Sequence, residues 1–183
     1  MSQESVKSAL LGMIEAIKAN PGVARVVFRA DTELVEDVRC TAKVRDFAPM
    51  TIDEPKELGG KDAAMNPVEL MLVALGTCQE IMYAAYASVM GVPLTQVKVS
   101  AKGHLNLKGL FAMDSAVPAG FQRITFETTI HSAADEATIK KLIETVESHC
   151  PVLDTLLRSI EVTGEVSING GPMHSHKAIA VAA

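Results

Sequence analysis

The chain is poor in aromatic residues, with no tryptophan, two tyrosines and five phenylalanines among 183 residues. Hydrophobic residues nevertheless make up 48% of it, so a core must be filled mainly by Ala, Val, Leu, Ile and Met. Small side chains of this kind let helices approach one another closely. The length fits one domain, or one protomer of an oligomer that shares a core with a second copy.

An excess of positive charge is also absent. The formal net charge is −5 and the sequence pI is near 5.5, and the Lys and Arg residues are scattered along the chain. This pattern argues against the electrostatic footprint that nucleic acids or anionic lipids require. We therefore expect no nucleic-acid partner and no membrane partner, and a neutral or apolar ligand fits better.

Cysteine is scarce, and its few copies have no regular spacing: Cys40, Cys78 and Cys150. The chain lacks Cys-x-x-Cys and His-x-x-x-His pairs, so we expect no metal and no cofactor. Two histidines near the C-terminus, His174 and His176, are weak evidence for a metal site. Three cysteines in a chain of this length are not a disulfide framework, which favours a reducing cytoplasm where a disulfide would be transient and catalytic.

The first twenty residues lack the basic stretch, the unbroken apolar run and the cleavage site of a secretory signal. They predict an amphipathic helix that ends near Asn20-Pro21-Gly22. The remaining organisation follows from hydrophobic period and turn residues. We expect three segments, namely an N-terminal helix over 1–22, a main domain over 23–168, and a loosely ordered tail over 169–183.

A long helix is predicted to begin at Asn66-Pro67-Val68-Glu69, because Asn is a good N-cap, Pro suits the first helical position, and Glu completes a capping box. It can run to about Met90, where Gly91-Val92-Pro93 stops it. Its length is that of a membrane span, but Gln79 and Glu80 near its middle argue against lipid. A helix that is apolar on nearly all sides must then be buried on nearly all sides.

The other segments predict an α+β fold, since strands and helices are grouped rather than alternating regularly. Loops are expected over 54–65 and 108–119. Strands are expected over 23–30, 33–46, 48–53, 95–107, 121–131 and 160–168, and helices over 132–149 and 152–158. A single sheet does not easily cover a helix that is apolar all round, so we expect a homodimer in which two such helices share a core.

Taken one at a time, the candidate functional residues have structural interpretations. A free cysteine in an apolar helix is most often a small core residue, which applies to Cys78 and, taken alone, to Cys150. Cys40 is expected to be inert packing on a strand. Arg45 alone is a strand-end surface charge, and His149 is expected to be structural, because adjacent helical residues point about 100 degrees apart.

Two cysteine motifs in their contexts carry a family resemblance. The stretch NPVELMLVALGTC, the later stretch ESHCPVLDTL, and Val44-Arg45-Asp46 followed by a Pro-Lys-Glu-Leu-Gly-Gly loop resemble the OsmC/Ohr family of thiol-dependent peroxidases. The resemblance spans roughly residues 38–168, close to a whole domain in the usual size range. The N-terminal helix and the C-terminal tail lie outside it.

The resemblance implies an intertwined homodimer with an OsmC-like fold, in which strands of both protomers wrap two central helices and the site lies at the subunit interface. Cys78 matches the cysteine that attacks the peroxide, Cys150 the resolving cysteine, and Arg45 the arginine that approaches the reactive thiol. The implied reaction is the reduction of small apolar organic hydroperoxides to alcohols, with electrons from a dithiol reductant, in oxidative-stress defence.

The residues support this chemistry. Burial of Cys78 in an apolar helix raises its pKa, so a nearby cation is required, and Arg45 can supply it. Attack leaves a sulfenic acid on Cys78, which Cys150 converts to a disulfide. Two alternatives stay open, namely a non-catalytic binding protein that holds an apolar ligand at the dimer interface, and a thiol switch without turnover.

One departure from the family pattern concerns a glutamate that holds the arginine in the hydroperoxide reductases, because Val68 occupies its register here. Glu69 is one residue later, and nine helical residues turn through about 900 degrees, which points Glu69 away from Cys78. Glu80 also lies on a different face from the thiol. The supporting carboxylate is thus unassigned, and Glu69 is expected to serve the capping box.

Overall fold

The structure, a computed structural model, describes residues 3–177. In chain order its elements are α1 (Gln3–Ala19), η1 (Pro21–Ala24), β1 (Asp31–Glu36), β2 (Arg39–Lys43), β3 (Met50–Ile52), η2 (Lys56–Leu58), α2 (Pro67–Met90), β4 (Leu94–Leu105), α3 (Leu107–Leu110), β5 (Phe121–Ser132), α4 (Glu136–His149), α5 (Pro151–Leu157), β6 (Thr163–Ser167) and β7 (Met173–Lys177). Strands and helices are mixed without regular alternation, as the sequence predicts.

The long helix α2 begins and ends where the sequence predicts. The Asn66 side chain accepts a hydrogen bond from the Glu69 backbone N–H at 2.9 Å, and the Glu69 carboxylate accepts one from the Asn66 N–H at 2.9 Å. At the other end Gly91 lies in the left-handed region with φ 70, a conformation that glycine adopts without steric cost. The capping-box role of Glu69 is confirmed.

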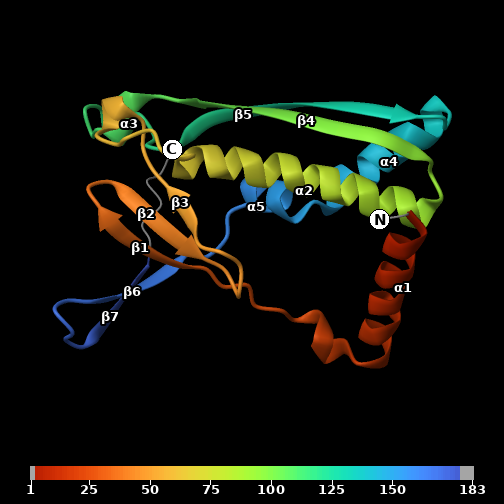
Figure 1. The fold of residues 1–183 in the computed structure, drawn as a ribbon, viewed down its shortest axis with the longest axis horizontal. Helices are drawn as coiled ribbons and strands as arrows, with labels where there is room; N and C mark the ends of the chain where they lie inside the picture. Colours follow the sequence, from red (N-terminus) through yellow and green to blue (C-terminus); the bar gives the residue numbers. More distant parts are fainter. Residues whose placement is uncertain (1–2, 178–183) are drawn as a thin grey trace.

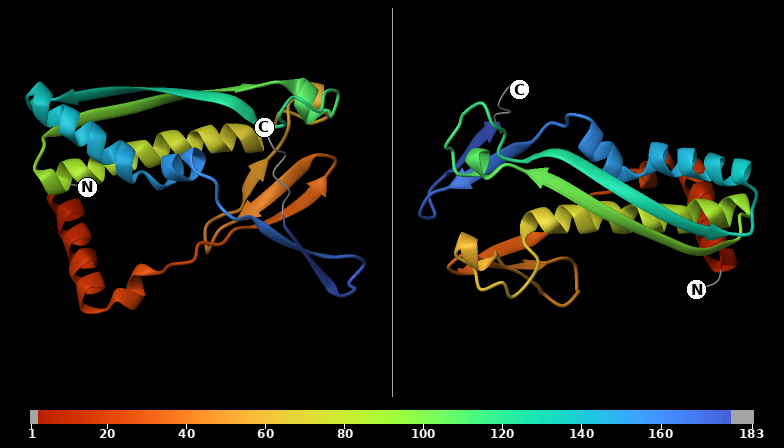
Figure 2. Two further views of the ribbon diagram at one scale, coloured as in Figure 1. Left: turned by 180° about the vertical axis from the view of Figure 1, so that it is seen from behind. Right: turned by 90° about the horizontal axis from the view of Figure 1, so that it is seen from above.

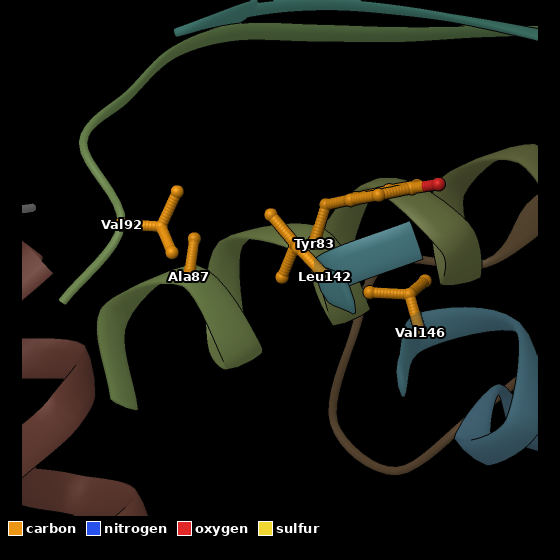
Figure 3. Close-up of a cluster of buried hydrophobic side chains, with 5 residues drawn as sticks. All are labelled: Tyr83, Ala87, Val92, Leu142 and Val146. Atoms are coloured by element: carbon orange, nitrogen blue, oxygen red, sulfur yellow. The ribbon is translucent and has the colours of Figure 1, made fainter. Parts of the chain in front are cut away.

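A long antiparallel ribbon of β4 and β5 lies along one side of α2, and α4 and α5 flank another (Figures 1 and 2). The strands are regular because their apolar residues alternate toward the helix. A buried cluster joins α2 to α4 and to the turn after α2 (Figure 3). Its members are Tyr83, Ala87, Val92, Leu142 and Val146. This cluster fixes the C-terminal half of α2 and leaves the thiol at its midpoint beside α5.

The first sheet has the order β1-β2-β3 and differs from expectation in one place. The segment 33–46, expected as one strand, contains a tight turn, so that β1 and β2 form a hairpin. Asp37 makes the turn with φ 47, a region that Asp enters more readily than most residues. The predicted strand over 48–53 is present as β3, paired to β2.

The expected strand over 23–30 is absent. Asn20 caps the short turn η1 instead, and the chain from there to β1 is extended without strand pairing. Val27 is 95% exposed and Phe28 is 92% exposed. The β-branched residues favour an extended backbone, but a strand also needs a neighbour for its hydrogen bonds, and the single chain offers none here.

Two further differences lie toward the C-terminus. The last expected strand, over 160–168, is shortened to β6, and it pairs with β7, which lies within the tail that was expected to be loosely ordered. Asn169 and Gly170 make the intervening turn with φ 52 and φ 72. The first residues of the loop expected over 108–119 belong to the short helix α3, Leu107–Leu110. Residues 178–183 of the tail lie outside the described residues.

The predicted loop over 54–65 is shaped by one buried carboxylate. Asp53 is 1% exposed and accepts backbone hydrogen bonds from Glu54, Lys61 and Ala63 at 3.0, 3.0 and 3.1 Å. The bond from Ala63 contributes most to a pKa of Asp53 below its ordinary value, and burial opposes it. The loop is thereby folded against the N-terminal end of α2.

The helix α2 is only partly covered by its own chain. Within its most apolar stretch of 18 residues, 17% of the residues are buried, and Met71, Val73 and Ile81 are 43%, 43% and 66% exposed. Its length and composition would allow it to cross a membrane. A single chain therefore leaves an apolar helical face open, and it does not provide the burial on nearly all sides that the sequence predicts.

Candidate functional site

Two cysteines that are far apart in sequence meet beside α2. Cys78 lies near the middle of that helix, and Cys150 lies between the end of α4 and the start of α5. Their sulfur atoms are 3.4 Å apart. Cys150 is fully buried and Cys78 is partly exposed. A disulfide needs the sulfurs at about 2.05 Å, so a small movement suffices to join them.

The local chain explains why Cys150 is held in place. Asp135 caps α4 at its start, and the amphipathic period of α4 packs Leu142 and Val146 into the core. Pro151 starts a new helix at once, so Cys150 has an extended backbone between two helices. A proline at the first helical position is favourable, and it prevents α4 from continuing.

The surroundings of Cys78 disfavour its thiolate within one chain. Burial is the largest cause of a pKa above the ordinary thiol value. A backbone hydrogen bond from Val152, in the first turn of α5, opposes that rise, whereas the neighbouring Cys150 adds to it. A thiol must be ionised to attack a peroxide. No cation is among the groups of the described chain that shift this pKa.

Arg45, the predicted cation, lies elsewhere in the single chain. Its guanidinium carbon is 4.5 Å from the centre of the Phe47 ring, in the turn between β2 and β3. This residue has φ 51, a conformation that costs energy for a side chain other than glycine and that recurs at functional sites. The structure therefore does not bring Arg45 together with the two cysteines inside one chain.

Both carboxylates that could hold Arg45, those of Glu69 and Glu80, accept hydrogen bonds from backbone N–H groups. Glu69 closes the capping box of α2, as described above. The Glu80 carboxylate accepts a hydrogen bond from the backbone N–H of Val99 on β4 at 3.0 Å. Neither Glu69 nor Glu80 forms an ion pair with Arg45 in the described chain, and Val68 carries no charge.

The hollows beside α2 are apolar. One of about 440 Å³ is lined by Met71 and Leu75, which lie on the same side of the helix as Cys78, and by Leu153 of α5. A second of about 640 Å³ lies at the N-terminal end of α2. Val68 lines both. Pockets of this size accept small organic molecules, although neither Cys78 nor Cys150 lines either hollow.

The remaining candidates have structural surroundings. The His149 ring lies 5.6 Å from that of Tyr86, and its Nδ1 is 2.9 Å from the Thr145 carbonyl oxygen. Cys40 is on β2 opposite Ile52 and Leu34. Among residues 3–177, no group of three or more His, Cys, Asp or Glu could hold a metal ion.

The sequence does not reveal one contributor to the site. The Val152 N–H acts through the backbone, so its side-chain identity carries no signal. The proline before it is the only available indication, because it starts a helix and orients the next amide groups toward the preceding turn.

Comparison with protein-family models assigns residues 59–165 to the family described as OsmC-like protein. The match contains both cysteines and covers more than half of the chain. The chain belongs to the OsmC-like family.

Relatives of this OsmC-like protein carry differing names. A hydroperoxide reductase of Mycoplasma genitalium is 27% identical over 126 residues, which cover 68% of this chain and 84% of that protein. An uncharacterised protein of Bacillus subtilis, YmaD, is 28% identical over 127 residues, 66% of this chain and 79% of that protein.

Among solved structures, an OsmC-like protein from Mycoplasma pneumoniae matches with a TM-score of 0.63 and 22% identity, over 72% of this chain and 88% of that one. An organic hydroperoxide resistance protein OsmC from Legionella pneumophila matches with a TM-score of 0.55 and 18% identity, over 72% of this chain and 91% of that one. These likenesses establish the OsmC-like fold.

The geometry predicts that oxidation joins Cys78 to Cys150 and spares Cys40. Treating the reduced protein with diamide should remove two of its three free thiols, because only this pair has its sulfur atoms within reach. Ellman titration gives the count, and peptide mass spectrometry identifies the bridge. Cys40→Ser should form the same bridge. An intermolecular disulfide as the main product would contradict the geometry.

Proposed function

We propose that this OsmC-like protein reduces organic hydroperoxides through Cys78 and Cys150 as part of oxidative-stress defence. The observation that carries the proposal is the 3.4 Å separation of two thiols that lie 72 residues apart in the chain. The name of the Mycoplasma genitalium relative supports it. The region that matches the family model contains both cysteines.

The reaction then has two steps at the protein. The Cys78 thiolate attacks the outer oxygen of the hydroperoxide, so that an S–O bond forms, the O–O bond breaks, and the alkoxide leaves and takes up a proton as the alcohol. Cys150 attacks the resulting sulfenic acid, which forms the disulfide and releases water. A dithiol reductant returns two electrons and two protons to restore both thiols.

A homodimer is part of the proposal. The open apolar face of α2 and the exposed segment around Val27 and Phe28 both need cover, and a second copy of α2 supplies a matching apolar surface. Burial against protein also accounts for Gln79 and Glu80 near the middle of the helix better than lipid does. We place the protein in the cytoplasm and give it no nucleic-acid partner, because its cysteines are free and its charge is negative.

Arg45 joins the site through this dimer. Since Arg45 and Cys78 are apart within one chain, the arginine reaches the thiol only when two chains assemble. Its charge then offsets the burial that raises the pKa of Cys78. This arrangement keeps the isolated chain inactive and gives the assembled protein a thiolate.

The apolar hollow between α2, β5 and α5 favours a second candidate function. Its lining by Met71, Leu75 and Leu153 also suits a non-catalytic protein that holds an apolar ligand. The two functions differ in one measurement, because a binding protein does not consume peroxide. Loss of cumene hydroperoxide in the presence of dithiothreitol, compared with a monothiol, decides between them.

Cysteine variants should separate attack from resolution. Cys78→Ser should abolish consumption of cumene hydroperoxide, whereas Cys150→Ser should consume about one equivalent per chain and stop as a sulfenic acid. The ferrous–xylenol orange assay measures peroxide, and dimedone labelling traps the sulfenic acid. Cys40→Ser is the matched control and should retain turnover. Full turnover by Cys78→Ser would end the enzymatic proposal.

Arg45→Ala should raise the midpoint pH of Cys78 alkylation by about one or more, because the thiolate loses an opposite charge. It should slow peroxide reduction in proportion to the lost thiolate. Arg45→Lys should recover only part, since a point charge does not replace the planar guanidinium. Iodoacetamide labelling of Cys150→Ser against pH gives the midpoint. Lys43→Ala, which removes a neighbouring cation, is the control, and an equal effect there would argue against a specific role for Arg45.

The dimer should be the folded unit. Size-exclusion chromatography with light scattering should give twice the chain mass of 19.5 kDa, and dilution should dissociate it only with unfolding. Ile81→Asp, on the open face of α2, should lower the mass or the stability of the dimer, whereas Thr125→Asp on the outer face of β5 should not. Circular dichroism monitors folding. A stable folded monomer of the wild type at micromolar concentration would contradict the proposal.

A further inference from the structure

One buried side chain of α2 has no hydrogen-bond partner. Gln79 is 0% exposed, and both its amide nitrogen and its amide oxygen are unpaired. Leaving a buried polar group unpaired costs about 1–3 kcal/mol, so such a residue needs an explanation. Because Gln79 is covered by its own chain, its partner is to be sought inside that chain and not in a second copy.

A second buried polar group without a partner lies on β5, on the other side of the contact between α2 and the β4–β5 ribbon. The Thr128 hydroxyl oxygen is likewise buried and makes no hydrogen bond of ordinary geometry. Thr128 stands opposite Val99 in the ladder of β4 and β5. Two residues of α2 close to Gln79 lie against Val99: a Cβ on Gly76, three residues earlier, would lie 3.8 Å from the Val99 side chain, and the Glu80 carboxylate accepts the Val99 N–H. Gln79 and Thr128 therefore belong to the same part of the interface.

Tyr83, one helical turn after Gln79, also interacts with Thr128. It is 1% exposed, and burial raises its pKa to about 12, with the Glu147 carboxylate adding to the rise and the Thr128 side chain opposing it. Thr128 thus faces the stretch of α2 that holds Gln79 and Tyr83. A hydrogen bond between Gln79 and Thr128, direct or through one buried water, would give partners to polar atoms that otherwise have none.

The need for such a pair follows from the composition of α2. A helix with apolar residues on every side has no strongly preferred face, so burial alone defines its rotation about its axis weakly. Rotation by about 20 degrees moves a Cα on a cylinder of about 2.3 Å radius by about 0.8 Å. The Cβ separation in disulfides spans about 1 Å. A rotation of this size therefore shifts Cys78 by most of the range of Cβ separations within which a disulfide to Cys150 can form.

We propose that Gln79 is a positioning residue, which pairs with Thr128 across the interface between α2 and β5 and so fixes the rotation of α2 that aims Cys78 at Cys150. Buried polar groups that set the register of packed helices are known devices. The inference rests on the proposed function for its biological meaning. The thiol geometry that it concerns is measurable without peroxide.

The test is the equilibrium of the Cys78–Cys150 disulfide with dithiothreitol in the full-length protein. In this exchange the two thiols are oxidised to the disulfide while the cyclic disulfide form of the reagent is reduced to its dithiol, with two electrons and two protons transferred. Gln79→Met keeps the side-chain length and removes the polar atoms. We expect it to lower the effective concentration of the thiol pair about tenfold, equivalent to about 30 mV for a two-electron couple, without lowering the melting temperature.

Thr128→Val should have the same effect from the other side of the interface. The double variant should be no worse than either single variant, because both remove one shared contact. Ser88→Ala is the matched control: Ser88 is also buried on α2, at 4% exposure, but its hydroxyl donates to Ala84 within the helix at 2.7 Å and carries no information on rotation. The effective concentration of the thiol pair in Ser88→Ala should stay within about twofold of the wild-type value.

An unchanged effective concentration in Gln79→Met would overturn the inference. Additive losses in the double variant would overturn the pairing with Thr128, and Thr128→Val alone decides the question if Gln79→Met does not fold. Peroxide turnover is measured separately. A wild-type protein that forms the disulfide but consumes no peroxide would refute the proposed function and leave this inference standing.

Discussion

Covering a helix that is apolar on every side is the constraint on which the rest of the structure depends. Apolar surface left in water costs free energy in proportion to its area. The chain meets this cost on two sides of α2, with the ribbon of β4 and β5 and with α4 and α5. The helix α1 contacts α2 near its C-terminal end, but Met71, Val73 and Ile81 stay exposed, so part of the apolar surface of α2 remains open. The homodimer that we propose thus follows from the same constraint as the fold.

This constraint also works against the chemistry. A thiol in an apolar helix is protected from water, but burial raises its pKa and removes the nucleophile. The Val152 N–H compensates only in part. In the dimer that we propose, Arg45 at the subunit interface would resolve the conflict, because it would restore the thiolate without exposing the helix. Chemistry and assembly would then be coupled.

Sequence reasoning succeeded where the determinants are local. The bounds of α2 depend on the cap at Asn66 and the stop at Gly91, both of which are read within a few residues. The hairpin of β1 and β2 was missed because its turn uses Asp37 without glycine or proline. The hairpin of β6 and β7 was missed although Asn169-Gly170 is a strong turn signal. The exposed segment 23–30 was assigned as a strand from propensity, which cannot supply a partner strand.

The residues of the candidate site also differ in how well the sequence predicts their positions. The proximity of Cys78 and Cys150 was expected from a resemblance, since spacing alone made each a core residue. Arg45 was expected near the thiol, yet the single chain holds it against Phe47, because its final position depends on contacts that one sequence does not encode locally. The displaced carboxylate remains a departure from the family pattern, with Glu69 committed to the cap and Glu80 to Val99.

The scarcity of aromatic residues affects how firmly packing fixes the rotation of α2. Ala, Val, Leu, Ile and Met have similar and adaptable shapes, and a core built from them tolerates small rotations of a helix. Large rings such as Tyr83 restrict rotation only where they are present, toward the C-terminal half of α2. Near Cys78 on α2, Gly76 has no side chain and Leu75 is aliphatic. The pairing that we propose for the buried amide at position 79 would supply directional bonding at this point of the helix.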